Sequence, residues 1–381
     1  MVTFSKEFQR NGAFSLAAIF IMAGCNGGIG RSITPAAPQA ALSRNAPVGD
    51  AISSDVSLLK RLKKQVVIGS AVDPQNGAQN PYGLTVAPMT SGLLKKGDLV
   101  VCNFNAKSNK QGTGASIVAL HPIAGSTPTH VSSDKTLVGC DALALDSSDG
   151  IWAAAMVAND NPVLSAGGKL ITNISGKPFD QPWGQVYAET KAGPSAFYAT
   201  NAGTGTIVRI NLGSKFTYDV IAKGFPVNHG VPGTALAPSG LAYDASNDTL
   251  YFADGKNNTV VAFKNVTKIP KGGIKAIDGG MKFSGPSAVD ARIVFAGKPL
   301  NGPISLALLP DHNLVAGNTL DPTGKNLMIE LSASGKLLDA RNVDTGASGA
   351  LFGIIATGTN DANTKVYFND DNDNNVQVLE Q

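Results

Sequence analysis

The chain has 381 residues and a net charge of only +3, from 31 basic and 28 acidic residues. A balance this close to neutral argues against a dedicated nucleic-acid-binding protein, which needs a concentrated basic surface. A hydrophobic fraction of 43% excludes a disordered chain, and the 43 glycines and 21 prolines suit many short strands joined by tight turns.

The first 24 residues have the features of a secretory signal peptide. Lys6 and Arg10 precede an apolar run over residues 14–23, which is shorter than the roughly 20 residues needed to span a bilayer. The run ends in Met-Ala-Gly-Cys at residues 22–25. This tetrapeptide resembles the lipobox of bacterial lipoproteins, which implies that Cys25 becomes the acylated first residue. An ordinary signal peptide is the alternative.

This resemblance implies that acylated Cys25 attaches the exported protein to a lipid bilayer, because two or more acyl chains give stable anchoring. Asn26 stands where an aspartate is associated with inner-membrane retention in lipoproteins, so we expect the outer membrane of a bacterial cell envelope. Residues 25–64 are predicted to form a flexible tether. Within it, residues 55–64 are compatible with a short helix that has Leu58, Leu59 and Leu62 on one side.

Two cysteines remain beyond Cys25, namely Cys102 and Cys140. An exported compartment permits a disulfide between them, which would stabilise the fold by about 3–4 kcal/mol. Two buried free thiols are the alternative.

From residue 65 onward, one pattern of three strands recurs. Each unit starts with a Pro-x-Gly-like turn into an alternating strand, continues into a strand that ends in a small residue and Asn or Asp, and finishes with another alternating strand. The clearest unit covers residues 238–263. Matching positions 83, 141, 184, 240, 305 and 353 are separated by 58, 43, 56, 65 and 48 residues, close to the period of four-stranded propeller blades.

We therefore predict an all-β fold over residues 65–381, a six-bladed β-propeller, with seven blades as the less favoured alternative. The last unit stops after its third strand, and an open edge there would expose unpaired backbone groups. Residues 65–69 are expected to supply the missing strand and close the ring.

The repeats also resemble known propeller families. Residues 250–254, Leu-Tyr-Phe-Ala-Asp, followed by 257–261, are similar to NHL and SMP-30-type repeats, and residues 197–207 are similar to the YVTN repeat. The resemblance covers roughly residues 75–381. It implies the architecture but not the function, because propellers carry many unrelated activities.

In propellers of this type the first strand of each blade lines the central channel, so the resemblance implies that six side chains lie near one mouth. Aromatic rings and an acid in that place could bind a small planar or sugar-like ligand. Packing that plugs the mouth is the alternative. The candidate binding residues are Tyr82, Asp141, Trp183, Ser239, Ser305 and Phe352.

Two families of propeller enzymes define an alternative function. SMP-30-type lactonases hold a divalent metal with carboxylate and Asn side chains, whereas the channel positions here offer one clear acid, Asp141. Streptogramin lyases use a histidine acid–base pair, and only His229 is expected near the mouth. Residues 369–375, Asn-Asp-Asp-Asn-Asp-Asn-Asn, could bind calcium, but a turn is the preferred interpretation. We therefore predict no catalytic residue, no metal ligand and no cofactor.

These patterns favour a monomeric, non-catalytic envelope lipoprotein whose channel rim binds a small ligand or an envelope protein. The alternative is a metal-dependent propeller enzyme, a hydrolase similar to lactonases or lyases. A third hypothesis is a structural or assembly lipoprotein.

Overall fold

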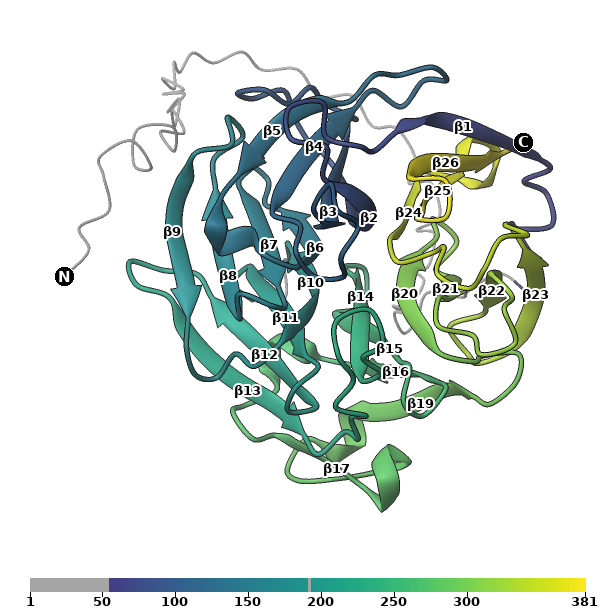
Figure 1. Cartoon of the computed structure of the whole chain (residues 1–381). Coiled ribbons are helices and arrows are strands. Elements are labelled where there is room, and N and C mark those ends of the chain that lie inside the picture. Colours follow the sequence, from purple (N-terminus) through teal and green to yellow (C-terminus); the bar gives the residue numbers. More distant parts are fainter. Residues whose placement is uncertain (1–54, 191–192) are drawn as a thin grey trace, which may run out of the picture. The chain divides into compact units, whose positions relative to one another are not determined.

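A computed structural model describes residues 55–190 and 193–381 (Figure 1). The predicted signal peptide, Cys25 and the tether up to residue 54 lie outside these described residues. Within them the chain forms β-strands, turns and five short 3-10 helices, and none of the described helices has the length and hydrophobicity of a membrane span. Figure 1 shows sheets set around a common centre, so the prediction of an all-β propeller is confirmed.

The described strands form six sheets, one for each predicted blade. Blade 1 contains β2 (Gln79–Val86), β3 (Leu99–Asn105), β4 (Ser116–Leu120) and β5 (Thr129–Ser133). Blade 2 contains β6 (Cys140–Leu145), β7 (Ile151–Ala155), β8 (Asp160–Leu164) and β9 (Leu170–Ser175). Blade 3 contains β10 (Pro182–Ala188), β11 (Ala196–Asn201), β12 (Thr206–Asn211) and β13 (Thr217–Lys223).

The remaining blades repeat this arrangement. Blade 4 contains β14 (Pro238–Asp244), β15 (Thr249–Asp254), β16 (Thr259–Phe263) and β19 (Ala291–Ala296). Blade 5 contains β20 (Pro303–Leu308), β21 (Leu314–Asn318), β22 (Leu327–Leu331) and β23 (Leu337–Asn342). Blade 6 contains β24 (Ile354–Thr357), β25 (Lys365–Asp370), β26 (Asn375–Glu380) and the N-terminal strand β1 (Lys64–Ser70).

An insertion between β16 and β19 extends blade 3 rather than blade 4. Its strands β17 (Ile274–Ile277) and β18 (Lys282–Ser284) join the outer edge of blade 3, where β17 runs parallel to β13. Arg209 on β12 donates hydrogen bonds to the carbonyl oxygens of Thr267 and Ile269, so it ties the insertion to blade 3. The 3-10 helices are η1 (Lys135–Leu137), η2 (Val266–Lys268), η3 (Asp278–Gly280), η4 (Ala288–Asp290) and η5 (Asp361–Asn363).

Strand β1 completes the last blade and closes the ring. It pairs antiparallel with β26, from Lys64 opposite Glu380 to Ser70 opposite Asn375. The Lys64 ammonium group also lies 2.8 Å from the Glu380 carboxylate. This pairing removes the open edge that the C-terminal unit would leave. The predicted closure by residues 65–69 is confirmed.

The first strands of neighbouring blades contact one another around the channel, and their approach leaves little room for side chains. A Cβ atom on Gly184 would lie 2.1 Å from the carbonyl oxygen of Ser239 in blade 4. A Cβ atom on Gly353 would lie 2.5 Å from the carbonyl oxygen of Tyr82 in blade 1. This contact explains why each repeat has a small residue at its start. The six residues are Gly83, Ala142, Gly184, Gly240, Ser305 and Gly353.

A β-bulge accompanies these small residues. The pairing of β20 with β21 shifts between Pro303 and Ser305, which leaves Ile304 without a partner. The same irregularity occurs at the start of β2, β6, β10 and β14. A bulge adds one residue to a strand and turns it locally. The residue before each of these small residues therefore lies outside the regular pairing with the second strand of its blade.

Residues 55–63 differ from the expected helix. Residues 58–62 form a turn in which Leu58, Leu59 and Leu62 are buried in the core between blades 5 and 6. The fully buried Glu330 carboxylate accepts hydrogen bonds from the Leu58 and Leu59 amides at 3.0 and 2.8 Å and from the Ser57 hydroxyl at 2.6 Å. The packed unit therefore begins before residue 65.

We predict that Gly184→Ala lowers the free energy of unfolding by about 1–3 kcal/mol, because the added methyl group would overlap the Ser239 carbonyl oxygen. Urea unfolding followed by circular dichroism measures this change. Gly167→Ala is the control, since its Cβ would have its nearest neighbour at 3.7 Å, and its effect should stay within about 0.5 kcal/mol. Equal unfolding midpoints for the two variants would contradict the close packing of blades 3 and 4.

Candidate functional site

Each blade contributes one residue at one mouth of the channel: five are bulge residues of the inner strands, and the sixth, Phe352, precedes β24. All six are buried, with at most 7% of any residue exposed. Five of the six predicted site residues occupy these positions, whereas Ser305 lies one residue further along β20. The bulge in β20 places Ile304 there and moves Ser305 to the blade contact, where its hydroxyl donates to the Leu351 carbonyl oxygen at 2.5 Å. The six residues are Tyr82, Asp141, Trp183, Ser239, Ile304 and Phe352.

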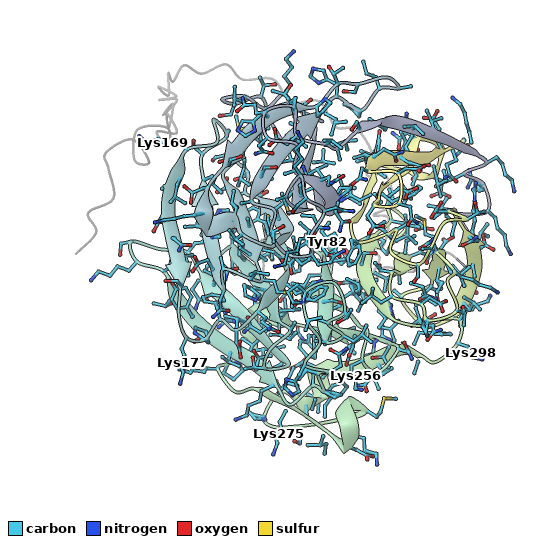
Figure 2. The ribbon with its side chains drawn as sticks, in the orientation of Figure 1. Tyr82, Lys169, Lys177, Lys256, Lys275 and Lys298 are labelled. Carbon is cyan, nitrogen blue, oxygen red and sulfur yellow. The ribbon has the colours of Figure 1, made fainter. Side chains whose placement is uncertain are left out.

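Apolar side chains fill this mouth. Tyr82, labelled near the middle of Figure 2, is stacked between Phe104 and Phe352, with ring centroids 4.1 and 3.4 Å away. We call the surrounding cluster the mouth plug; its buried members are Tyr82, Phe104, Met156, Trp183, Ala202, Ala235, Ala237, Ile304 and Phe352.

The connection between blades 3 and 4, residues 224–237, contributes Ala235 and Ala237 to the mouth plug. Asn228 folds this connection on itself, because its side chain accepts a hydrogen bond from the Gly230 amide at 2.9 Å. Further along, a Cβ atom on Gly233 would lie 2.9 Å from the Gln111 side chain of blade 1. The alternative of packing that plugs the mouth therefore describes this structure.

A small polar group lies at the edge of the mouth plug. The Tyr82 hydroxyl donates a hydrogen bond to Gln111 Oε1 at 3.3 Å, and the Asn80 amide donates to the same oxygen at 3.4 Å. Gln111 is exposed, whereas Asn80 is buried and its Oδ1 has no hydrogen-bond partner among the described residues. This group connects the buried Tyr82 with solvent.

Asp371, the residue after β25, lies close to this polar group. It is partly exposed, and its Oδ1 atom has no hydrogen-bond partner in the described part of the chain. Burial, and then the charge of Asp370, raise the pKa of Asp371 to about 8. The pKa of Tyr82 is raised well above its usual value by burial and next by the charge of Asp371. Asp371 therefore keeps its proton at neutral pH.

Hydrogen bonds hold the neighbouring carboxylates. Asp344 accepts from the Asn326 and Asn372 side-chain amides at 2.9 and 2.5 Å. Asp370 accepts from the Gln377 amide at 2.7 Å, and its pKa is raised to about 6 by burial and then by the charge of Asp344. Residues 371–374 form the turn between β25 and β26, in agreement with the preferred interpretation of this acidic segment.

Asp141 lies where blade 2 meets the channel. It is 3% exposed, and neither carboxylate oxygen has a side-chain partner within the described residues. Burial, and then the charge of Cys102, raise the pKa of Asp141 well above its usual value. Cys102 and Cys140 are buried free thiols, so the free-thiol alternative describes this structure. Burial raises the pKa of the Cys140 thiol.

The histidines do not form an acid–base pair at the mouth. His229 lies exposed in the connection between blades 3 and 4. The other three each place Nδ1 within 2.5 to 2.9 Å of a carboxylate oxygen. These pairs are His121–Asp98, His130–Asp73 and His312–Asp244.

The mouth does not fit the divalent metal of SMP-30-type lactonases. Its ring of bulge residues contains one carboxylate, Asp141. Across residues 55–190 and 193–381, no group of three or more His, Cys, Asp or Glu side chains could hold a metal ion. No reaction step is therefore derived through such a metal.

The geometry defines a six-bladed β-propeller with a filled mouth. No family profile matches the sequence, and no curated protein matches it. Among solved structures, the chain is similar to a protein assigned as a gluconolactonase, with 11% identity over 83% of this chain and 91% of that chain and a TM-score of 0.52.

Two further structures have similar folds. A chain of a nidogen–laminin complex has 14% identity over 74% of this chain and 87% of that chain, with a TM-score of 0.51. Virginiamycin B lyase from Staphylococcus aureus has 15% identity over 80% of each chain, with a TM-score of 0.46. At these identities the likeness shows the fold alone.

The interpretation as a non-catalytic propeller that binds a ligand at the channel rim is wrong. The residues predicted to form that rim are buried in packing, so they present no surface to a ligand.

The sequence analysis missed Asn80, Gln111 and Asp371 as members of one site. Asp371 belongs to the acidic segment that was examined for calcium, but its neighbours were not known. Gln111 lies in the connection between β3 and β4, where no periodic pattern indicates what it contacts. Only the fold brings these residues to the same mouth.

We predict that Asp371 makes the protein less stable as the pH rises. Its pKa of about 8 in the folded state exceeds the unfolded value of about 3.9. The folded state therefore binds a proton that the unfolded state has released, and this stabilisation is lost as the pH rises towards 8. Asp371→Asn should match the wild type at pH 4 and have the higher urea midpoint at pH 9. The exposed Asp373→Asn is the control, and identical pH slopes for wild type and Asp371→Asn would refute the prediction.

Proposed function

We propose that this chain is an enzyme that hydrolyses small neutral cyclic esters by general acid catalysis at the mouth of the propeller. The observation that carries the proposal is the Asp371 carboxyl group, which keeps its proton near neutral pH at a partly exposed position. A carboxyl group with such a raised pKa is a typical catalytic acid.

The groups around Asp371 suit an uncharged substrate that carries oxygen atoms. Gln111 and Asn80 supply amide groups, and Tyr82 supplies a hydroxyl group already held by Gln111. Because Gln111 is exposed, a substrate can reach this edge without displacing residues 224–237.

The reaction balances without a metal ion. A water molecule attacks the carbonyl carbon, and the Asp371 carboxyl group donates its proton to the leaving alkoxide oxygen as the C–O bond breaks. The Asp371 carboxylate then takes a proton from the attacking water, so the products are a carboxylic acid and an alcohol. Proton transfer of this kind contributes about 10²–10⁴-fold to a rate.

The metal-dependent form of this function has less support. A divalent cation prefers several oxygen ligands, whereas the ring of bulge residues provides the single carboxylate of Asp141. We therefore propose acid catalysis by Asp371 in its place.

We also propose that the enzyme works as a monomer in a bacterial cell envelope, anchored by acylated Cys25. The support is the sequence pattern of residues 6–25, which lies outside the described residues. Labelling of the wild type but not Cys25→Ser by a clickable fatty acid would test this location.

The activity is tested by proton release from five- and six-membered lactones with the purified full chain between pH 6 and 9. Asp371→Asn should lower kcat/KM by about 100-fold or more. The wild-type kcat/KM should fall above about pH 8, where Asp371 loses its proton. Asp373→Asn, in the same turn, should keep full activity.

Chelation of metal ions by EDTA distinguishes acid catalysis by Asp371 from metal-dependent catalysis. EDTA should leave activity unchanged if Asp371 is the acid. Activity that EDTA abolishes, and that Asp371→Asn does not reduce, would favour the metal-dependent alternative. No turnover of any lactone by the wild type would contradict the proposed function.

A further inference from the structure

Next to the mouth plug, the inner strands line an axial cavity of about 60 Å³ that is partly open to solvent. A buried water needs on the order of 10–15 Å³ of such space, so the cavity is large enough for a few small occupants. Four glycines are among the residues that line it. These glycines are Gly83, Gly184, Gly240 and Gly353.

Two polar side chains in the cavity wall lack side-chain partners. Asp141 is 3% exposed and Gln185 is 7% exposed. The amide oxygen and nitrogen of Gln185 have no hydrogen-bond partner among the described residues. The Asp141 carboxylate has no side-chain partner there and is approached only by the main-chain amides of Asp141 and Ala142. Buried polar groups are almost always satisfied, so two such groups on one cavity indicate an occupant.

The position of Gln185 is unusual for this propeller. It immediately follows the small residue Gly184 on β10, and the equivalent residue of every other blade is aliphatic. All six of these residues line the cavity. A leucine would serve packing equally well at this position, so the amide of Gln185 is a specific feature. The aliphatic residues are Leu84, Leu143, Leu241, Leu306 and Ile354.

An ionised Asp141 carboxylate in this wall would have no positive side chain to balance its charge. No Lys, Arg or His is among the residues that line the cavity. A buried charge is normally paired or coordinates a cation, because burial without a partner is costly. Carboxylate, amide and main-chain carbonyl oxygens are hard ligands that suit small hard cations.

We propose that the axial cavity binds one monovalent metal cation, sodium or potassium, between the Asp141 carboxylate and the Gln185 amide oxygen. One carboxylate balances one positive charge, which favours a monovalent ion over a divalent one. Main-chain carbonyl oxygens and water complete the coordination. The ion enters from the end opposite the mouth plug, where the next residues of three inner strands, Thr85, Val186 and Ile355, are partly exposed.

This site is separate from the proposed acid Asp371 and does not depend on that function. A bound cation stabilises the folded state in proportion to the logarithm of its concentration above the dissociation constant. Its ligands come from blades 2 and 3, so binding joins these two neighbouring blades.

The test is thermal unfolding of the full chain at constant ionic strength, with choline chloride replaced stepwise by sodium or potassium chloride. For the wild type we expect Tm to rise by about 3 °C or more in at least one of these salts. Asp141→Asn should lose this dependence, as should Gln185→Leu, which reproduces the residue type of four other blades.

Two controls define the outcomes. Asp373→Asn, which is exposed and is not among the residues that line the cavity, should respond like the wild type. A wild-type Tm that does not depend on sodium or potassium would overturn the proposal, as would an unchanged response in both cavity variants. Stabilisation by millimolar calcium but by neither monovalent ion would also overturn it.

Discussion

The close main-chain contact between neighbouring inner strands is the constraint on which this structure depends. At Gly184 and Gly353 a side chain would overlap the carbonyl oxygen of the next blade, so each repeat needs a small residue at that point. A bulge beside five of these small residues sets one further residue of each blade at the mouth, and in blade 6 the residue before Gly353 takes this place. Six such residues decide whether the channel is open, and four large apolar ones close it here.

Because these residues close the mouth, they separate two polar environments along the channel. Above the mouth plug, Asp371 and the Tyr82–Gln111 hydrogen bond remain in contact with solvent. Next to it, Asp141 and Gln185 are buried without side-chain partners. The first environment suits proton transfer to a substrate, and the second suits a small ion that holds blades together. Each role follows from the depth at which the side chain lies in the channel.

Much of this fold could be predicted because propeller repeats leave strong local signals. Apolar and polar side chains alternate along the strands, and the repeats place a small residue after Pro-x. Together with the strand that is missing after residue 380, these signals predict a closed ring. Ile304 was missed because a bulge shifts pairing by one residue without changing composition. The insertion at residues 264–290 and the contacts of Gln111 were missed because they depend on which blades become neighbours. The Leu58–Leu62 turn was missed because its partner, Glu330, is distant in sequence.

Hydrogen–deuterium exchange of the amides in β1 and β26 tests the closed ring most directly. If β1 completes blade 6, the amides in residues 64–70 and 375–380 that form the pairing exchange as slowly as those of central strands such as β15. If the ring is open, residues 64–70 exchange within seconds like a free segment. That result would contradict the account of the channel, its mouth and its cavity together.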